Sequence, residues 1–132
     1  YLSLCQAATR PDRVAGLVLI ATGPGFRDPD RRARWNDRIG EFAAAQGVHP
    51  LASHLGEQPD SLVIDALGSV SAPTLIVVGS EDRAYHRGAE LMIDTMPDAT
   101  LLVVAGAGHF PHRTHHRQVA PAILSLLDRV ST

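Results

Sequence analysis

The chain has 132 residues, of which 45% are hydrophobic and 20% charged, a size and composition typical of one globular domain. Its 12 basic and 14 acidic side chains nearly balance, which argues against bulk attraction to nucleic acid or to an anionic membrane. The apolar runs are too short to span a bilayer. The single cysteine, Cys5, cannot form an internal disulfide, so we expect a reducing, cytoplasmic location.

The first segment, "YLSLCQAATR", has the pattern of a helix that Pro11 ends. Its apolar face comprises Leu4, Cys5, Ala7 and Ala8. The chain begins with Tyr1, and neither a cap residue nor an entry turn precedes the helical pattern. From this we expect the segment to continue a longer chain.

Three apolar runs have the character of strands: residues 14–21, 73–79 and 99–106. Each is continuous rather than alternating, which is typical of parallel strands buried on both faces. A helix is predicted between the last two runs, over residues 85–96. The order of helices and strands predicts an α/β fold with a parallel sheet and right-handed crossovers.

A second long helix is predicted at the end of the chain, over residues 115–130. Pro121 is expected in its first turn, where the missing N–H has little effect. The apolar stripe of this helix comprises Val119, Ile123, Leu126, Leu127 and Val130.

Residues 26–68, between the first two strands, differ from the rest in their pattern of apolar and charged residues. An amphipathic helix is predicted with Asp28 as its N-cap and Pro29 in its first turn. Its stripe comprises Trp35, Ile39, Phe42 and Ala43. Phe26, Trp35 and Phe42 could line a substrate pocket or pack a small helical lid. Five arginines lie nearby, but the local charge is balanced, which favours a solvated face over a nucleic-acid surface.

Two polar residues follow the last two strands at their carboxyl ends. Asp82 lies in "GSEDRAY" after the second strand, and His109 lies in "GAGH" after the third. Ligands and catalytic groups gather at this edge of a parallel sheet, and neighbouring strands lie about 5 Å apart. We therefore expect a carboxylate–imidazole pair, with Glu81 as the rival to Asp82 and with Arg83 and Tyr85 packing the loop.

These segments resemble the C-terminal half of an α/β-hydrolase. "GSED" and "GAGH" resemble that family's acid and histidine segments, and "YLSLCQAATRPDRVAGLVLIATG" resembles its stretch after the nucleophile. The resemblance covers residues 1–132 and implies a partial α/β-hydrolase domain, with three parallel strands, flanking helices and a short helical cap insertion at residues 26–68. It implies Asp82 as triad acid and His109 as triad base, a small-molecule substrate, and no cofactor.

The implied reaction is hydrolysis of a carboxylic ester or related acyl bond by a serine nucleophile. The sequence contains no G-x-S-x-G, so the resemblance places the nucleophile upstream of Tyr1 and predicts that the chain alone is inactive. Ser3 and Cys5 are poor substitutes because they lie within a helix. An upstream aspartate would indicate a dehalogenase or epoxide hydrolase, and a non-catalytic module is the third possibility.

Two further expectations concern metals and assembly. His109, His112, His115 and His116 form a histidine-rich stretch, but Pro111 interrupts it and no cysteine is near, so we expect no metal site. "RTHHRQ" also departs from the acidic or polar residue that the family usually shows after its histidine. An uncovered first strand would favour self-association through the open sheet edge.

Overall fold

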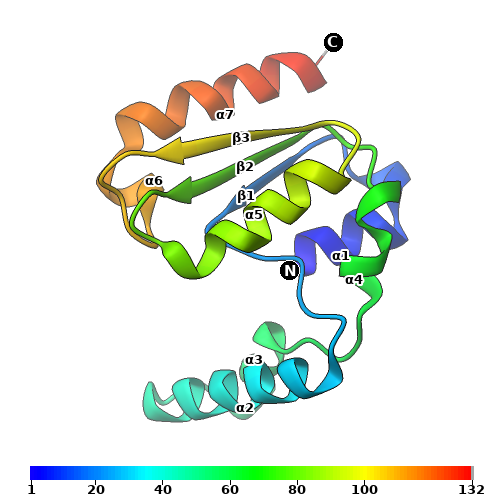
Figure 1. Ribbon diagram of the computed structural model, residues 1–132, viewed down its shortest axis with the longest axis vertical. Coiled ribbons are helices and arrows are strands. Elements are labelled where there is room, and N and C mark those ends of the chain that lie inside the picture. The colour runs from blue at the N-terminus through cyan, green and yellow to red at the C-terminus, as the bar shows by residue number, and fades with distance from the viewer. Residues whose placement is uncertain (132) are drawn as a thin grey trace.

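A computed structural model describes residues 1–131, apart from the side chain of Pro50. Its strands form one parallel sheet in the order β1-β2-β3, so β2 lies in the middle. In Figure 1, α7 covers one face of the sheet, α1 and α5 cover the other, and α2 and α3 lie beyond that second layer. The elements are α1 Leu2–Thr9, β1 Leu17–Ile20, α2 Pro29–Ala45, α3 Pro50–Ser53, α4 Leu62–Ala66, β2 Thr74–Gly79, α5 Arg83–Thr95, β3 Ala99–Val104, α6 Pro111–Thr114 and α7 His116–Val130, with 3-10 turns at Pro11–Arg13, His54–Gly56 and Leu67–Ser69.

The predicted three-stranded parallel α/β architecture is confirmed, and the central strand is its most buried element. Every residue of β2 is buried. Ile76 and Val78 pack on the α1–α5 side with Leu4 and Met92, which are both fully buried. Leu75 and Val77 pack on the other side, in a second cluster that contains Val119 and Leu126 of α7. The alternation of β2 side chains thus ties together the two helical layers.

The two outer strands are less buried than the sequence predicted. In β3 only Val104 is buried, and Val103 is 48% exposed. In β1 the residues alternate between buried and half-buried, and the strand covers only Leu17–Ile20 of the predicted residues 14–21. Ala21 ends it with a φ of +47°, a left-handed backbone conformation that breaks the extended run. Edge position, which composition does not encode, explains the difference in burial.

The helix after β2 begins at Arg83 instead of Tyr85, and the last helix begins at His116. Pro121 therefore lies inside α7, and the prediction that it occupies the first turn is wrong. Proline has no backbone N–H, so the helical hydrogen bond to the carbonyl of Arg117 is missing. Both residues are exposed, so water can replace the missing donor on the outer face of the helix. Leu127, expected in the apolar stripe, is 49% exposed.

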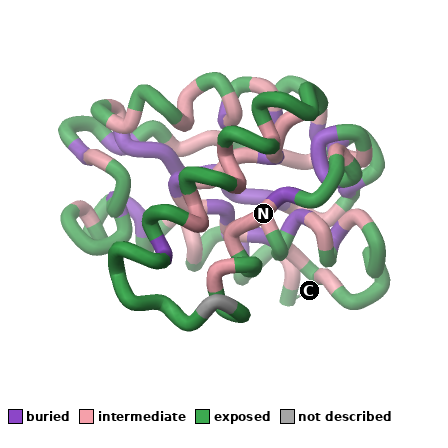
Figure 2. The backbone as a smooth tube through the Cα atoms, turned by 90° about the horizontal axis from the view of Figure 1, so that it is seen from below, coloured by how far each residue is buried: buried purple, intermediate pink, exposed green. Residues whose placement is uncertain are grey.

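Residues 29–56, which we call the cap segment, are separated from the sheet (Figure 1). Its main helix α2 begins as predicted, with the Asp28 carboxylate accepting the N–H of Arg31 at 2.9 Å and Pro29 in the first turn. Seen from below in Figure 2, α2 is mostly exposed or half-buried, and the buried stretches of the chain lie behind it. Phe42, expected to pack with the stripe, is 66% exposed.

The chain returns to the sheet before it reaches β2. Val63, Ile64 and Leu67 are buried in the cluster that also holds Leu4 of α1. Helix α4 thus packs on the same layer as α1, and the boundaries of the predicted cap insertion, residues 26–68, stay a prediction. Among the described residues no helix combines the length and apolarity that crossing a membrane requires.

Candidate active site

The loops that follow β2 and β3 are bonded to each other. Gly79 and Val104 are register partners at the carboxyl ends of the two strands. Beyond them, the N–H of Ser80 donates to the Val104 carbonyl at 2.9 Å, and that of Glu81 donates to the Ala107 carbonyl at 2.9 Å. The N–H of Gly106, whose φ is +73°, donates to the Ser80 hydroxyl at 2.9 Å. These hydrogen bonds therefore join the loops that follow β2 and β3 into one unit at the carboxyl ends of the two strands.

Gly79 makes this close approach possible. A Cβ atom at this position would overlap the carbonyl oxygens of both Ala107 and Gly108. Both obstacles are backbone atoms, so no side-chain rotation relieves the overlap. The glycine of "GSED" is thus required by the loop that carries "GAGH".

The structure brings the two predicted site residues together. Nδ1 of His109 lies 2.8 Å from Oδ2 of Asp82. The carboxylate is largely buried, with 11% of its side chain exposed, whereas the imidazole is 42% exposed. A proton on Nδ1 donated to the carboxylate leaves the Nε2 lone pair free. No described residue forms a hydrogen bond with Nε2, and Asp82 rather than its neighbour Glu81 holds the ring.

Two aromatic rings contact the imidazole of His109. The ring of Tyr85 lies with its centroid 4.8 Å away, and the ring of Phe110 lies 4.9 Å away in an edge-on arrangement. Burial, followed by the negative charge of Asp82, raises the pKa of Tyr85, so its hydroxyl stays protonated beside the pair. The sequence pattern predicts Tyr85 only as loop packing and does not reveal Phe110.

His86 is a further residue that the sequence pattern did not reveal. Its Nε2 lies 2.9 Å from the carbonyl oxygen of Gly79, so the ring braces the turn between β2 and α5 from inside. Spacing alone could not have found it, because the turn geometry brings the side chain back toward the strand end.

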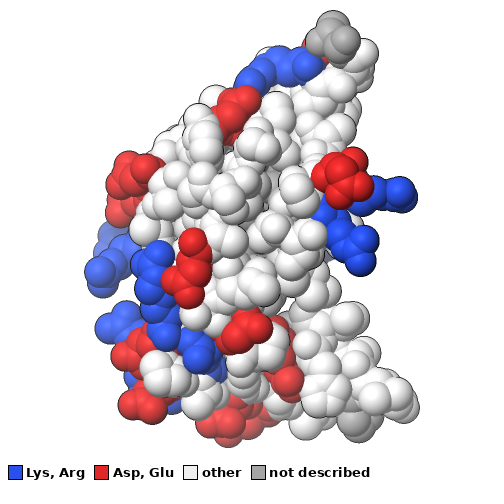
Figure 3. Space-filling view, turned by 90° about the vertical axis from the view of Figure 1, so that its right-hand side faces the viewer, with Lys and Arg blue, Asp and Glu red and all other residues white. Residues whose placement is uncertain are grey.

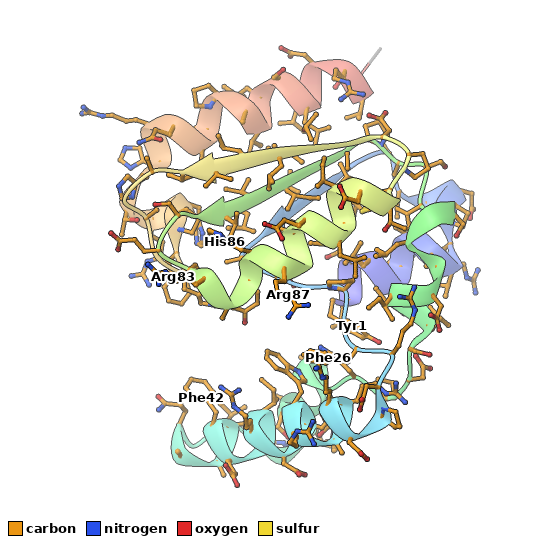
Figure 4. All side chains as sticks on the ribbon, viewed as in Figure 1. Tyr1, Phe26, Phe42, Arg83, His86 and Arg87 are labelled. Carbon is orange, nitrogen blue, oxygen red and sulfur yellow. The ribbon has the colours of Figure 1, made fainter. Side chains whose placement is uncertain are left out.

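A cavity of about 870 Å³ lies between the cap segment and helix α5. Phe26 and Trp35 line it, as the sequence suggested, and Phe42 does not. Its wall includes Tyr85, whose ring contacts the imidazole of His109, so the cavity approaches the pair through that ring. Figure 4 shows Phe26 on the cap side and Arg87 extending from α5 toward it.

Polar bonds from α2 position one wall of this cavity. The indole N–H of Trp35 donates to the Gly56 carbonyl at 3.0 Å. The side chain of Asn36 bonds both backbone groups of Gln58, at 2.8 Å to its N–H and 3.0 Å to its carbonyl. Gln58 is consequently held at 6% exposure, and its buried Oε1 has no hydrogen-bond partner among the described residues.

The remaining histidines do not converge on a shared centre. Nδ1 of His115 lies 2.8 Å from the hydroxyl of Thr114, and His112 lies in α6 beside Phe110. No set of three or more potential ligands among the described residues is arranged to hold a metal ion. Ser3 and Cys5 lie on α1, away from any strand-to-helix turn. In the face shown in Figure 3, acidic and basic groups are intermingled around the lower part of the molecule.

Comparison with known proteins shows what the chain is similar to. The chain is 41% identical over 66 residues to the polyketide synthase ThaQ of Burkholderia thailandensis, covering 47% of this chain and 3% of that protein. The structure is similar to that of MenH from S. aureus, with a TM-score of 0.77 and 16% identity over 99% of this chain and 65% of that chain. The structure is also similar to that of a thermophilic esterase from Thermogutta terrifontis, with a TM-score of 0.72 and 24% identity. This match covers 100% of this chain and 62% of that chain.

These structural likenesses show the fold, and the chain spans about two thirds or less of the solved relatives. The family model described as "Alpha/beta hydrolase family" matches residues 2–122, from α1 through the first half of α7. That range contains all three strands and both loops of the candidate site. The chain therefore belongs to the alpha/beta hydrolase family.

Proposed function

We propose that Asp82 and His109 are the acid and base of a nucleophilic triad that hydrolyses a carboxylic ester or related acyl bond. One observation carries this proposal: the 2.8 Å contact between His109 Nδ1 and Asp82 Oδ2 at the carboxyl ends of neighbouring parallel strands. A largely buried carboxylate on one ring nitrogen, with the other nitrogen free, is the arrangement that a general base requires.

The chemistry follows from that arrangement. Nε2 of His109 accepts the hydroxyl proton of the nucleophile while the nucleophilic oxygen bonds to the acyl carbon. The imidazolium then returns the proton to the departing oxygen as the C–O bond breaks, and a water molecule repeats both steps on the acyl-enzyme. Asp82 stays ionised throughout and stabilises the imidazolium. The exposed side of the ring is where the nucleophile and substrate would approach.

In this proposal the nucleophile is a serine outside these 132 residues, because the sequence contains no G-x-S-x-G. A dehalogenase or epoxide hydrolase would use an aspartate there, and a non-catalytic module would have no nucleophile. The Thermogutta terrifontis neighbour is described as an esterase, which supports the serine nucleophile.

The test is hydrolysis of 4-nitrophenyl butyrate by the native, full-length protein. His109→Ala should lower kcat by a factor on the order of 10⁴ to 10⁶, and Asp82→Asn by about 10⁴ or somewhat less. His116→Ala is the matched control, since His116 is an exposed histidine at the start of α7. Rates of His109→Ala within threefold of the parent would overturn the proposal.

A fluorophosphonate probe identifies the nucleophile directly. A serine activated by His109 should attack the phosphorus and expel fluoride, and the labelled peptide should contain that serine. Labelling should be lost in His109→Ala and kept in His116→Ala. Esterase activity without any labelled serine would favour the aspartate alternative, and the absence of both activity and labelling would favour the non-catalytic one.

A further inference from the structure

Three arginines of the cavity wall form no ion pair within the described part of the chain. Arg31 and Arg38 belong to α2 and Arg87 belongs to α5, so they lie on opposite sides of the cavity. None of the three guanidinium groups forms an ion pair or hydrogen bond with a described residue. Arg27, also in the wall, differs: it pairs with Asp65 at 2.7 Å and donates to the Ile64 carbonyl at 3.2 Å.

One carboxylate shares the wall with these arginines. Asp28 caps α2, and the N–H of Arg31 lowers its pKa, with smaller contributions from the charges of Arg31 and Arg34. Asp28 is therefore ionised at neutral pH and offsets part of the positive charge. Three guanidinium groups against one carboxylate still leave an excess of positive charge.

The rest of the wall is largely apolar or aromatic. It includes Phe26, Trp35, Ile39, Leu55 and Tyr85. A smaller adjoining cavity of about 330 Å³ is lined by Phe26 and Trp35 together with Arg31, Arg34 and Arg38. The arginines of α2 therefore share a helix face with its tryptophan and accompany aromatic rings in both cavities. These arginines and Arg87 are themselves exposed, and what sets them apart is that they line a cavity together with aromatic rings.

Arginine stays charged at every physiological pH and presents a planar set of N–H donors that matches a carboxylate or phosphate in two-point contact. Beside apolar walls its attraction for an anion is less screened than in bulk water. Figure 4 shows Arg87 extending from α5 toward the cap segment, so an anion in the cavity could be approached from both sides. The wall thus suits a ligand that combines an apolar chain with an anionic oxygen group.

We propose that this cavity binds an acyl substrate whose chain carries a carboxylate or phosphate group at a distance from the scissile bond, and that Arg31, Arg38 and Arg87 bind that group. The inference rests on the proposed function, because the cavity approaches His109 through Tyr85. It adds the substrate class: anionic acyl compounds are bound in preference to neutral ones.

Binding can be measured without bond cleavage through Trp35, the single tryptophan of the chain, which lines both cavities. The probes are octanamide, which is neutral, and suberamic acid, the same eight-carbon amide with a carboxylate at its far end. An eight-carbon amide ending in a phosphate monoester is the third probe. In the native, full-length protein, Trp35→Phe identifies the fluorescence that comes from this residue.

Suberamic acid or the phosphate amide should bind at least tenfold more tightly than octanamide, and the preference should weaken as salt is added. The tighter of the two anionic probes identifies the anion. Arg38→Met and Arg87→Met should each reduce the preference about fivefold or more while leaving octanamide binding within twofold. Arg117→Met, a change at an exposed arginine of α7, should have no effect.

Equal affinity for the neutral and anionic probes would overturn the inference. So would a preference that Arg117→Met reduces as much as Arg38→Met does. The charge preference should persist in His109→Ala, because binding does not need the base. Comparing the titration with the ester hydrolysis of the parent protein separates the two proposals. A parent protein that shows the charge preference but hydrolyses no ester leaves the substrate-class inference standing and removes the proposed reaction. Hydrolysis of neutral and anionic esters at equal rates leaves the proposed reaction standing and removes the substrate-class inference.

Discussion

Different interactions stabilise the two regions of the molecule. One region is the sheet with its covering helices, and the other is the cap segment. Around β2 the chain buries apolar side chains on both faces, and Leu4, Met92 and Val104 are fully buried. In the described part of the cap segment the one buried hydrophobic residue is Ala43. The bond from Trp35 to Gly56 closes the segment on itself, and the two bonds between Asn36 and Gln58 attach it to the chain that follows.

This difference indicates that the sheet is the more rigid region and the cap segment the more adaptable one. The Asp82–His109 pair is built on the well-packed part, where its geometry is set by strand register and backbone bonds. The cavity lies between that part and the cap segment, so its width depends on contacts that open at lower free energy. Under the proposed function this division serves catalysis, because the base must be placed accurately while the substrate must enter.

The largest effect is expected from Gly79→Ala. The added methyl group meets two backbone carbonyl oxygens, so the loops must separate and the His109–Asp82 contact should be lost. We expect a loss of about 4 kcal/mol or more in the free energy of unfolding. Urea denaturation measures it, and Gly108→Ala, whose Cβ would meet nothing within 4 Å, should change stability by about 1 kcal/mol at most.

A matched pair of substitutions compares the two regions directly. Ile76→Ala in β2, at a residue 1% exposed, should lower the free energy of unfolding by about 2–5 kcal/mol. Ile39→Ala in α2, at a half-buried residue beside Gly56, should lower it by about 1.5 kcal/mol or less. Equal losses at the two sites would show that the cap segment is packed as firmly as the sheet.

Asn36→Ala should loosen the cap segment while leaving the sheet intact. It removes both side-chain bonds to the backbone of buried Gln58, a loss of about 1–3 kcal/mol. Hydrogen exchange should accelerate in residues 29–58 and stay unchanged in β2. Asp37→Ala, a change at the exposed neighbouring residue, is the control. Faster exchange in β2 would contradict the division described above.

Gln58→Met should stabilise the protein slightly. The buried Oε1 of Gln58 has no partner among the described residues, so replacing the amide by a thioether of similar length removes an unsatisfied acceptor. We expect a gain of about 1 kcal/mol in the free energy of unfolding. A loss of similar size would mean that the amide has a partner in the native protein.

The smallest effect is a pH dependence on the alkaline side. Burial and the charge of Asp82 raise the pKa of Tyr85, so above its ordinary value near 10 the folded state binds more protons than the unfolded state. Stability should therefore fall as pH rises through 10, and Tyr85→Phe should make this fall less steep. Unfolding at pH 8 and above tests it, and an identical slope in both proteins would contradict the assignment.

The sequence by itself determined the parts of this protein that depend on local chemistry. "TLIVVG" is apolar at nearly every position and forms the buried central strand, and the Asp28–Pro29 pair starts α2 as expected. The polar residues after β2 and β3 were predicted to meet because parallel strands end at one edge, and Asp82 and His109 do so. Their catalytic roles remain a proposal.

Tertiary structure decided what depends on neighbours. "ATLLVV" resembles "TLIVVG" in composition yet forms a half-exposed strand, because only position in the sheet separates an edge from a centre. Pro121 lies inside α7 because favourable packing of the neighbouring turns outweighs one lost bond at an exposed position. The convergence of Arg31, Arg38 and Arg87 on one cavity arises from chain segments about fifty residues apart, which no local pattern encodes.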